Sequence, residues 1–276
     1  MAQAPGKPPP RTEYIKAIKE FKPIDGSVNK ARILLLGPSG VGKSSFVNSV
    51  FSIFREYSSL NCLTFRPYLI RGVKEGTFLN LALCDAMGLS EKKGEGLHSD
   101  DIISIIQGHV PDGYQVNFIA NARRRKTDGY VAAPTLNRKI HCVVYVMDAS
   151  TVSDVSAELQ KKLGEIRQRV TSMNIPQLVL MTKVDRADPS VIKDIRKVDQ
   201  SEIIREKAEQ LAALLGDTSI FPVKNYVPNE LELNNNCDVL LLTAVYEMLR
   251  LADNCMDDIA TKSVNDITER LGALST

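Results

Sequence analysis

The residues best suited to chemistry form one short run, GPSGVGKS at positions 37–44. Glycines in a G-x-x-x-x-G-K-[ST] run let successive backbone N–H groups point at phosphate oxygens. Lys43 adds a full positive charge, and the Ser44 hydroxyl is a hard oxygen ligand of the kind that Mg²⁺ prefers. An apolar strand-like run, Ala31–Leu36, precedes this motif and a helical pattern follows it, which is the context a phosphate-binding loop requires. We therefore predict such a loop rather than a chance glycine-rich turn.

A second motif, Thr182-Lys183-Val184-Asp185, follows the apolar run Pro176–Met181. A carboxylate at Asp185 can accept hydrogen bonds from both N1–H and the exocyclic NH₂ of guanine. Adenine presents an acceptor and a C–H at those positions, so it would leave the charge unpaired. The stem of Lys183 can lie along the plane of the base. Because the motif follows a phosphate-binding loop, it predicts a guanine nucleotide as the ligand.

A third element, Asp85-Ala86-Met87-Gly88, ends the apolar run Thr77–Cys84 between the other two motifs. Asp85 is expected to hold Mg²⁺ through water, and the N–H of Gly88 is expected to contact the γ-phosphate. Through such contacts, the nucleotide state changes the conformation of a loop. Leu89 stands where small G proteins place a glutamine that orients the attacking water. Leucine has no donor or acceptor, so we expect slow intrinsic hydrolysis.

Two further elements have less specific sequence signals. A threonine that completes the Mg²⁺ shell should precede or begin the second strand; Thr64 is the candidate, and a plain β-branched strand residue is the alternative. The last guanine-contacting loop is expected at Lys224 and Asn225, where a backbone N–H would meet the guanine O6. We thus assign Mg²⁺ to Ser44, Thr64 and Asp85, and Thr64 is also the candidate catalytic residue. The expected nucleotide-binding residues are Ser39, Gly40, Val41, Gly42, Lys43, Ser44, Ser45, Asp85, Gly88, Thr182, Lys183, Asp185, Lys224 and Asn225.

The elements that must position these residues alternate between apolar strand patterns and amphipathic helical patterns. Such alternation predicts an α/β fold, a doubly wound, mostly parallel sheet flanked by helices. We expect a flexible Pro-rich tail and short helix over residues 1–28, a G domain over 29–254 and a C-terminal helical extension over 255–276. The short helix is expected over Glu13–Phe21, and Ser99 is expected to cap a helix that runs to about Gln107. Two separate helices are expected near the end, Asp238–Leu251 and about Asp257–Leu271.

Composition narrows the class of protein. The 276 residues carry a net charge of +2 and 43% hydrophobic residues, the balance of an ordinary globular chain without strong steering toward nucleic acid or anionic membrane. No apolar run reaches the roughly 20 residues of a membrane span, and no secretory signal is evident. The five scattered cysteines suit buried, reduced thiols. We therefore expect a cytoplasmic protein. The basic run Arg123, Arg124, Arg125 and Lys126 is assigned to a solvated loop. The alternatives are an anion, nucleic-acid or membrane contact, or an arginine presented to a neighbour's nucleotide.

In this order, the three motifs are typical of P-loop GTPases. The longer stretches ARILLLGPSGVGKSSFVNSV, LCDAMGL, HSDDIISIIQGHVPDGYQ, KIHCVVYVMDAS and LMTKVD resemble the interferon-induced protein 44 family. The resemblance covers about Pro10 to Asp258. It implies a cytoplasmic, interferon-inducible protein with an antiviral or immune-regulatory role. This role rests on the resemblance alone, because composition and motif spacing do not indicate it.

Three hypotheses remain open. In the first, which we favour, GTP or GDP with Mg²⁺ switches a surface that binds an unidentified protein partner. In the second, the chain is an assembly-stimulated GTPase, similar to dynamin-like or septin-like proteins, that self-associates through its nucleotide face. In the third, it is a nucleotide-independent scaffold, which the intact Gly42, Lys43, Ser44 and Asp185 disfavour. No clear nucleic-acid or membrane contact is expected.

Overall fold

The structure, a computed structural model, describes residues 9–55, 66–71, 78–86, 88–90, 97–112, 130–227, 230 and 232–273. Of these, residues 55, 66, 67, 71 and 262–273 are described by their backbone alone. The helices and strands are α1 (Arg11–Glu20), β1 (Ala31–Leu36), α2 (Lys43–Arg55), β2 (Arg66–Arg71), β3 (Phe78–Asp85), α3 (Ser99–Ile106), η2 (Leu136–Arg138), β4 (Cys142–Asp148), η3 (Val152–Asp154), α4 (Ala157–Ser172), β5 (Gln177–Thr182), α5 (Val184–Ala187), α6 (Pro189–Lys193), η4 (Ile195–Gln200), α7 (Glu202–Leu215), β6 (Ile220–Pro222) and α8 (Asn235–Ala273).

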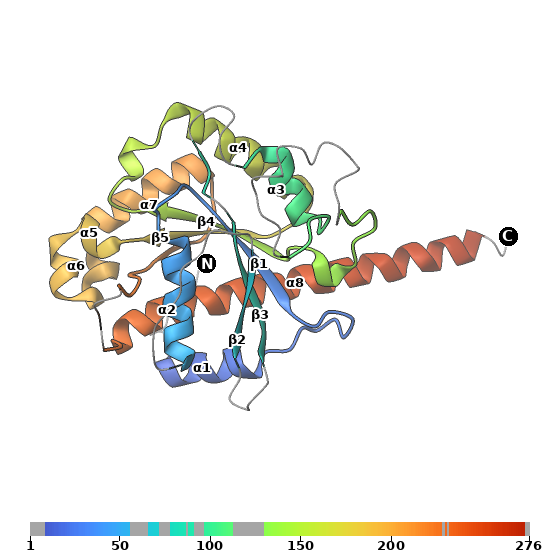
Figure 1. The fold of residues 1–276 in the computed structure, drawn as a ribbon, viewed down its shortest axis with the longest axis horizontal. Helices are drawn as coiled ribbons and strands as arrows, with labels where there is room; N and C mark the ends of the chain where they lie inside the picture. Colours follow the sequence, from blue (N-terminus) through green and yellow to red (C-terminus); the bar gives the residue numbers. More distant parts are fainter. Residues whose placement is uncertain are drawn as a thin grey trace, which may run out of the picture.

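The six strands form one sheet in the order β2-β3-β1-β4-β5-β6. All neighbouring pairs are parallel except β2 and β3, which are antiparallel. Figure 1 shows α3 and α4 above the sheet and α1 below it, so both faces are covered. This is the doubly wound, mostly parallel fold, with a short N-terminal helix and a C-terminal helical extension, that the alternating pattern predicted. The sheet brings the ends of β1, β3, β4 and β5 to one edge.

The residues of β1 explain why the central strand reads as a continuous apolar run. Ile33 and Leu35 belong to the cluster of buried residues that includes α1, α2 and α8. Leu34 and Leu36 belong to the opposite cluster, with α3, α4 and α7. Alternate side chains of a strand point to opposite faces, so a strand covered on both faces has no polar face. Each of these four residues is fully buried, which makes β1 a rigid base for the loop that follows it.

Several boundaries differ from expectation. The cap of α3 is His98 rather than Ser99: its Nδ1 accepts from the Asp100 N–H, and Asp101 accepts from the His98 N–H. The short elements α5, α6 and η4 after β5 were not predicted, because four to six residues are too few to show a period.

The end of the chain was predicted as two helices and is one, α8. No glycine or proline lies between Leu251 and Asp257, and Ala252, Cys255 and Met256 are buried against the domain, so nothing interrupts the helix there. The boundary expected between residues 254 and 255 therefore lies inside α8. The end of α8 projects past the other elements in Figure 1.

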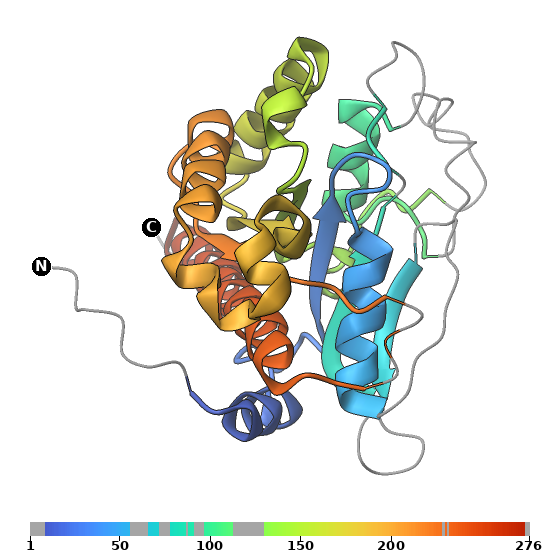
Figure 2. The ribbon, with the colours of Figure 1, turned by 90° about the vertical axis from the view of Figure 1, so that its left-hand side faces the viewer.

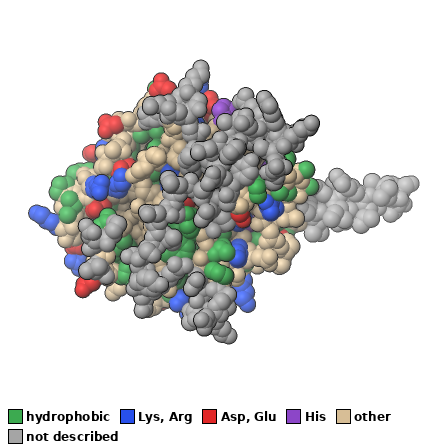
Figure 3. Space-filling view, in the orientation of Figure 1, with side chains coloured by type: hydrophobic (Ala, Val, Ile, Leu, Met, Phe, Trp, Pro, Cys, Tyr) green, Lys and Arg blue, Asp and Glu red, His purple; other side chains and the backbone are tan. Residues whose placement is uncertain are grey.

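The charges on the surface and the state of the cysteines are as the composition predicted. Figure 3 shows basic and acidic side chains interspersed over the part of this face that is drawn in colour. Cys84, Cys142, Cys237 and Cys255 are buried thiols rather than disulfides; Cys62 lies outside the described residues. Among the helices in the described part of the chain, none combines the length and apolar character needed to cross a lipid bilayer.

His141, which immediately precedes β4, is fully buried. Its Nδ1 accepts from the Arg32 backbone N–H at 3.0 Å, so its proton is on Nε2, which donates to the Leu136 carbonyl at 3.0 Å. Burial lowers the pKa of His141 from 6.5 to about 4. Above pH 6.5 neither the folded nor the unfolded state carries this proton. Between pH 6.5 and 4 the unfolded state binds it and the folded state does not.

The free energy of unfolding should therefore fall as the pH drops from 6.5 toward 4, and His141 alone should contribute about 2 kcal/mol of that loss at pH 5. His141→Asn, whose amide oxygen can accept from Arg32, should be less stable than the native chain at pH 7. Its stability should nevertheless change less between pH 7 and 5. Urea unfolding of both proteins at the two pH values measures this difference. Parallel pH profiles for the two proteins would contradict the assignment.

Candidate functional site

The loop between β1 and α2 has the backbone shape that a phosphate cradle needs. Gly40 and Gly42 have φ of +79° and +99°, in the left-handed region that favours glycine. A Cβ on Gly37 would lie 2.2 Å from the Val146 carbonyl oxygen, so the chain can leave β1 only with glycine there. The Phe46 N–H bonds the Gly42 carbonyl at 2.8 Å and starts α2. Figure 2 shows the loop curving from the end of β1 into the start of α2. The positive end of this helix dipole thus faces the loop.

Lys43 is buried with its ammonium turned onto the loop. Nζ donates to the carbonyls of Gly37 at 2.9 Å and Pro38 at 2.7 Å. Burial lowers the pKa of Lys43, and the nearby Asp85 opposes that shift. An anion placed in the loop would meet a cation that is already held there.

The second residue of α2, Ser44, meets the end of β3. Its hydroxyl donates to Asp85 Oδ2 at 2.5 Å, while Asp85 Oδ1 is buried without a hydrogen-bond partner. Burial raises the pKa of the Asp85 carboxyl, and the Ser44 hydroxyl and the Lys43 ammonium partly counter this. Such a carboxylate is poorly compensated, so a cation or a donor beside it would be favourable.

This pair fits Mg²⁺. The described residues contain no cluster of three or more His, Cys, Asp or Glu side chains that could hold a metal by themselves. Mg²⁺ commonly uses one or two protein oxygens, with substrate phosphates and water completing its shell. Ser44 and Asp85 supply that set beside the loop. Thr64, the third expected ligand, lies outside the described residues, as do Arg123–Lys126.

The segment after Asp85 touches the loop directly. A Cβ on Gly88 would lie 2.6 Å from Ser39 Oγ and 2.7 Å from Ser39 N, so glycine alone permits this approach. The Leu89 N–H bonds the Gly37 carbonyl at 3.0 Å. The Leu89 side chain is 2% exposed and packs into the core with α3 and α4. It is therefore held in the core and has no polar atom with which to orient a water molecule.

The T-K-x-D segment also contacts the loop. The Thr182 hydroxyl lies 2.5 Å from the Val41 carbonyl and 3.1 Å from the Met147 carbonyl, and it is the donor in both contacts. Lys183 Nζ donates to the Gly40 carbonyl at 2.8 Å and to Asp148 Oδ2 at 2.6 Å. Asp185 lies half-buried in the first turn of α5. It makes no hydrogen bond or ion pair with the described part of the chain, so its carboxylate can receive donors.

The segment after β6 completes the arrangement. Asn225 Nδ2 donates to the Gly42 carbonyl at 3.0 Å, and Asn225 Oδ1 is buried without a partner. Lys224 forms an ion pair with Glu230 instead of extending toward the loop. The sequence predicted a contact from the backbone N–H of Asn225. In the structure it is the side chain of Asn225 that contacts the loop.

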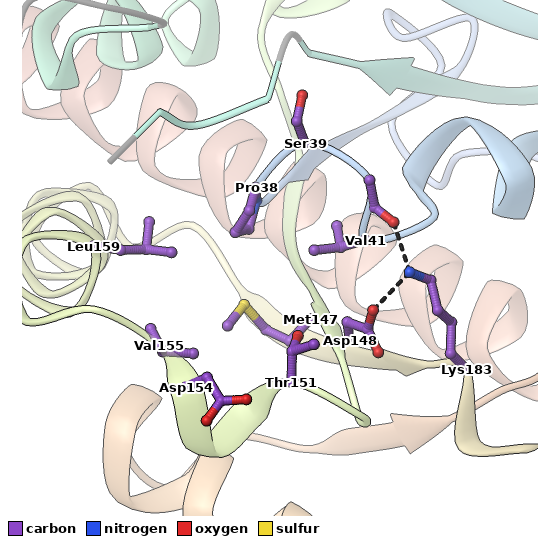
Figure 4. A pocket seen from close by; sticks show the side chains of 11 residues that line it. Pro38, Ser39, Val41, Met147, Asp148, Thr151, Asp154, Val155, Leu159 and Lys183 are labelled. Atoms are coloured by element: carbon purple, nitrogen blue, oxygen red, sulfur yellow. Dashed lines mark hydrogen bonds and ion pairs between the residues drawn. The ribbon is translucent and has the colours of Figure 1, made fainter. Parts of the chain in front are cut away.

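Sequence reasoning missed Asp148. It ends β4 and pairs across the sheet with Thr182 of β5. With Pro38, Val41, Leu159 and Lys183 it lines a cavity of about 310 Å³ beside the loop, shown in Figure 4. The available signal was its position: like Asp85, it is a carboxylate at the end of a buried strand.

The structure thus brings together residues from five segments that are distant in sequence: the loop after β1 and the ends of β3, β4, β5 and β6. The loop can bind phosphate oxygens, Ser44 and Asp85 can bind a hard cation, and the ends of β5 and β6 can contact a base that lies over Lys183.

Comparison with known proteins places this arrangement in context. No family model matches the chain. It is 35% identical over 273 residues to human interferon-induced protein 44, an alignment that covers 95% of this chain and 61% of that protein. It is 32% identical over 276 residues to human interferon-induced protein 44-like, covering 95% of this chain and 60% of that protein. The chain therefore spans about three-fifths of the length of these relatives.

The fold has a counterpart among solved structures. A dimerisation-deficient mutant of Toc33 from Arabidopsis thaliana superposes with a TM-score of 0.51 and 17% sequence identity, covering 88% of this chain and 91% of that one. That likeness supports the fold alone. The sequence matches extend over nearly all of this chain and include the loop, Asp85 and the T-K-x-D segment. The chain is therefore related in sequence to the interferon-induced protein 44 family.

Proposed function

We propose that the chain binds GTP or GDP together with Mg²⁺ and acts as a nucleotide-dependent switch with slow hydrolysis. The observation that carries the proposal is the junction of three segments: Lys43 within the loop, Ser44 against Asp85, and Lys183 on the Gly40 carbonyl. In this proposal the loop N–H groups and Lys43 bind the phosphates, Mg²⁺ is held by Ser44 and Asp85, and Asp185 selects guanine. Thr64 and the backbone N–H groups of Lys224 and Asn225 are further proposed contacts.

Regulation would follow from the contact of Gly88 with Ser39. A γ-phosphate in the cradle would lie beside this contact, so its presence or loss would move the segment that ends at Leu89. That movement would alter a surface for a protein partner. The names of the relatives support a link to interferon induction. From the family resemblance of the sequence we further propose that the switch acts in the cytoplasm, in an antiviral and innate immune response.

Hydrolysis would be slow because the Leu89 side chain is buried and apolar and cannot orient water as a glutamine does. The alternative is a GTPase that is stimulated by assembly through its nucleotide face. Phosphate release measured against protein concentration separates the two. A turnover number that is constant and within about 10⁻⁴–10⁻² s⁻¹ supports the switch, and one that climbs with concentration supports assembly.

Thermal unfolding with added nucleotide tests the proposal itself. GDP or GTP with Mg²⁺, at about a hundred times its dissociation constant, should stabilise the fold by about 2.7 kcal/mol. For a chain of this size that raises the melting temperature by about 5 °C or more. ATP at the same concentration should give a much smaller shift. If no guanine nucleotide shifts the melting temperature even at millimolar concentration, the chain is a nucleotide-independent scaffold; equal shifts with ATP would contradict the role of Asp185.

A further inference from the structure

Lys183 is held from two sides by contacts within the chain. Its ammonium donates to Asp148 Oδ2 at 2.6 Å and to the Gly40 carbonyl at 2.8 Å. Figure 4 shows both contacts at one end of the cavity, with the Lys183 stem leading back to the end of β5. Lys183 itself adopts a left-handed backbone conformation with φ +55°, which costs energy for a residue with a side chain. The ammonium contacts offset that cost.

Asp148 is in turn held by its neighbours. Its Oδ1 accepts from the Ser150 N–H at 2.9 Å and from the Ser150 hydroxyl at 2.6 Å, which leaves Oδ2 aimed at Lys183. The Asp148 side chain is 7% exposed and that of Lys183 is 24% exposed. A charge-assisted hydrogen bond that is shielded from water in this way is stronger than a surface ion pair.

We propose that Asp148 is a positioning residue for guanine recognition, acting through Lys183. This rests on the proposed function. The carboxylate fixes the ammonium, which holds the lysine stem along the place of the base and ties the end of β5 to the phosphate cradle. The base would meet a surface that is already ordered, so less entropy is lost on binding. The Lys183 ammonium bonds Asp148 and the Gly40 carbonyl, so the nucleotide would contact only the methylene groups of this side chain.

Asp148→Asn keeps the shape and removes the charge, so it tests this inference with the whole chain. Affinity for GDP, measured by calorimetry with Mg²⁺, should fall about tenfold, the lower range for a charge-assisted hydrogen bond. Affinity for magnesium pyrophosphate, which has no base, should change less than about twofold. Asp154→Asn is the matched control: this exposed carboxylate lines the same cavity, and GDP affinity should be unchanged.

A double-mutant cycle distinguishes positioning from a structural role. Lys183→Met should weaken GDP about as much as Asp148→Asn does, and adding Asp148→Asn to it should cause no further loss. In the nucleotide-free native chain, acetic anhydride should acetylate Lys183 more slowly than the exposed Lys19 on α1, and Asp148→Asn should remove this protection. If that variant does not fold, Asp148→Glu replaces it, because it shifts the carboxylate by one methylene; the same linked losses are expected.

Native-like GDP affinity in Asp148→Asn, or additive losses in the double variant, would overturn the inference. So would equal losses for GDP and pyrophosphate. A native chain that takes up no GDP would instead remove the proposed function. The two failures are therefore distinguishable in one set of titrations.

Discussion

Replacing Lys43 by alanine should lower the affinity for GDP and GTP by more than about a hundredfold. Lys43 is the one ammonium in the described part of the chain that bonds the loop carbonyls of Gly37 and Pro38. Its burial already lowers its pKa, so the free protein bears the cost of keeping this charge out of water. A phosphate in the loop would relieve that cost, and hydrogen bonds between ionised groups are worth about 1.5–3 kcal/mol each. Lys43 would make such bonds to two phosphates.

The same substitution should leave the fold intact. The Gly37 carbonyl keeps its bond from the Leu89 N–H at 3.0 Å, and the helix that begins at residue 43 keeps the Phe46–Gly42 bond. Calorimetric titration of GDP with Mg²⁺ measures the loss, and thermal unfolding without nucleotide checks the fold. Lys19→Ala, an exposed lysine on α1, is the control and should bind normally. A Lys43→Ala protein that binds GDP within tenfold of the native chain would remove the loop from the binding site.

How far the sequence predicts this site depends on how local each feature is. The glycine-rich turn between a buried strand and a helix could be predicted, because the glycines that need unusual φ values, the lysine and the serine are adjacent in the chain. Its binding of phosphate stays a prediction. Asp85 and the T-K-x-D segment were each predicted to end or follow a buried strand, and the parallel sheet brings the ends of those strands to one edge. These features can be predicted from the residue spacing within motifs and from the periodicity of apolar residues.

Asp148 could not be predicted in the same way. Its partner Lys183 directly follows the neighbouring strand β5, and the order β1-β4-β5 that makes them neighbours is a property of the whole sheet. No short motif encodes that order. The Asn225 side chain is a similar case, since its contact with Gly42 spans 183 residues of sequence. The break expected after Leu251 was wrong, because Ala252, Cys255 and Met256 continue the helical spacing of three and four residues past residue 254 and are buried against the domain.

Changing Asp185 to asparagine should convert the preference for guanine into a preference for xanthine. In the native chain the half-buried carboxylate has no bond to the described residues, and it stands in the first turn of α5 beside Lys183. Guanine would satisfy it with two N–H donors. Asparagine would place an NH₂ group toward a guanine NH₂, so two donors would meet, and the affinity for GDP should fall by about a hundredfold or more. Xanthine has an oxygen at that position, which can accept from the asparagine.

Competition between GDP and xanthosine diphosphate for the protein measures this exchange of preference. Asp188→Asn is the matched control, three residues further along. The Asp188 carboxylate accepts from the Ser190 N–H, the Ser190 hydroxyl and the Ser201 hydroxyl, so it joins α6 to the start of α7. Its substitution should lower the melting temperature and leave the base preference unchanged. The two aspartates differ in their bonds within the described part of the chain. The Asp188 carboxylate accepts three hydrogen bonds, whereas the Asp185 carboxylate accepts none and can bind a ligand. If Asp185→Asn lost GDP without gaining the xanthine nucleotide, Asp185 would support the fold and base selection would belong to another group.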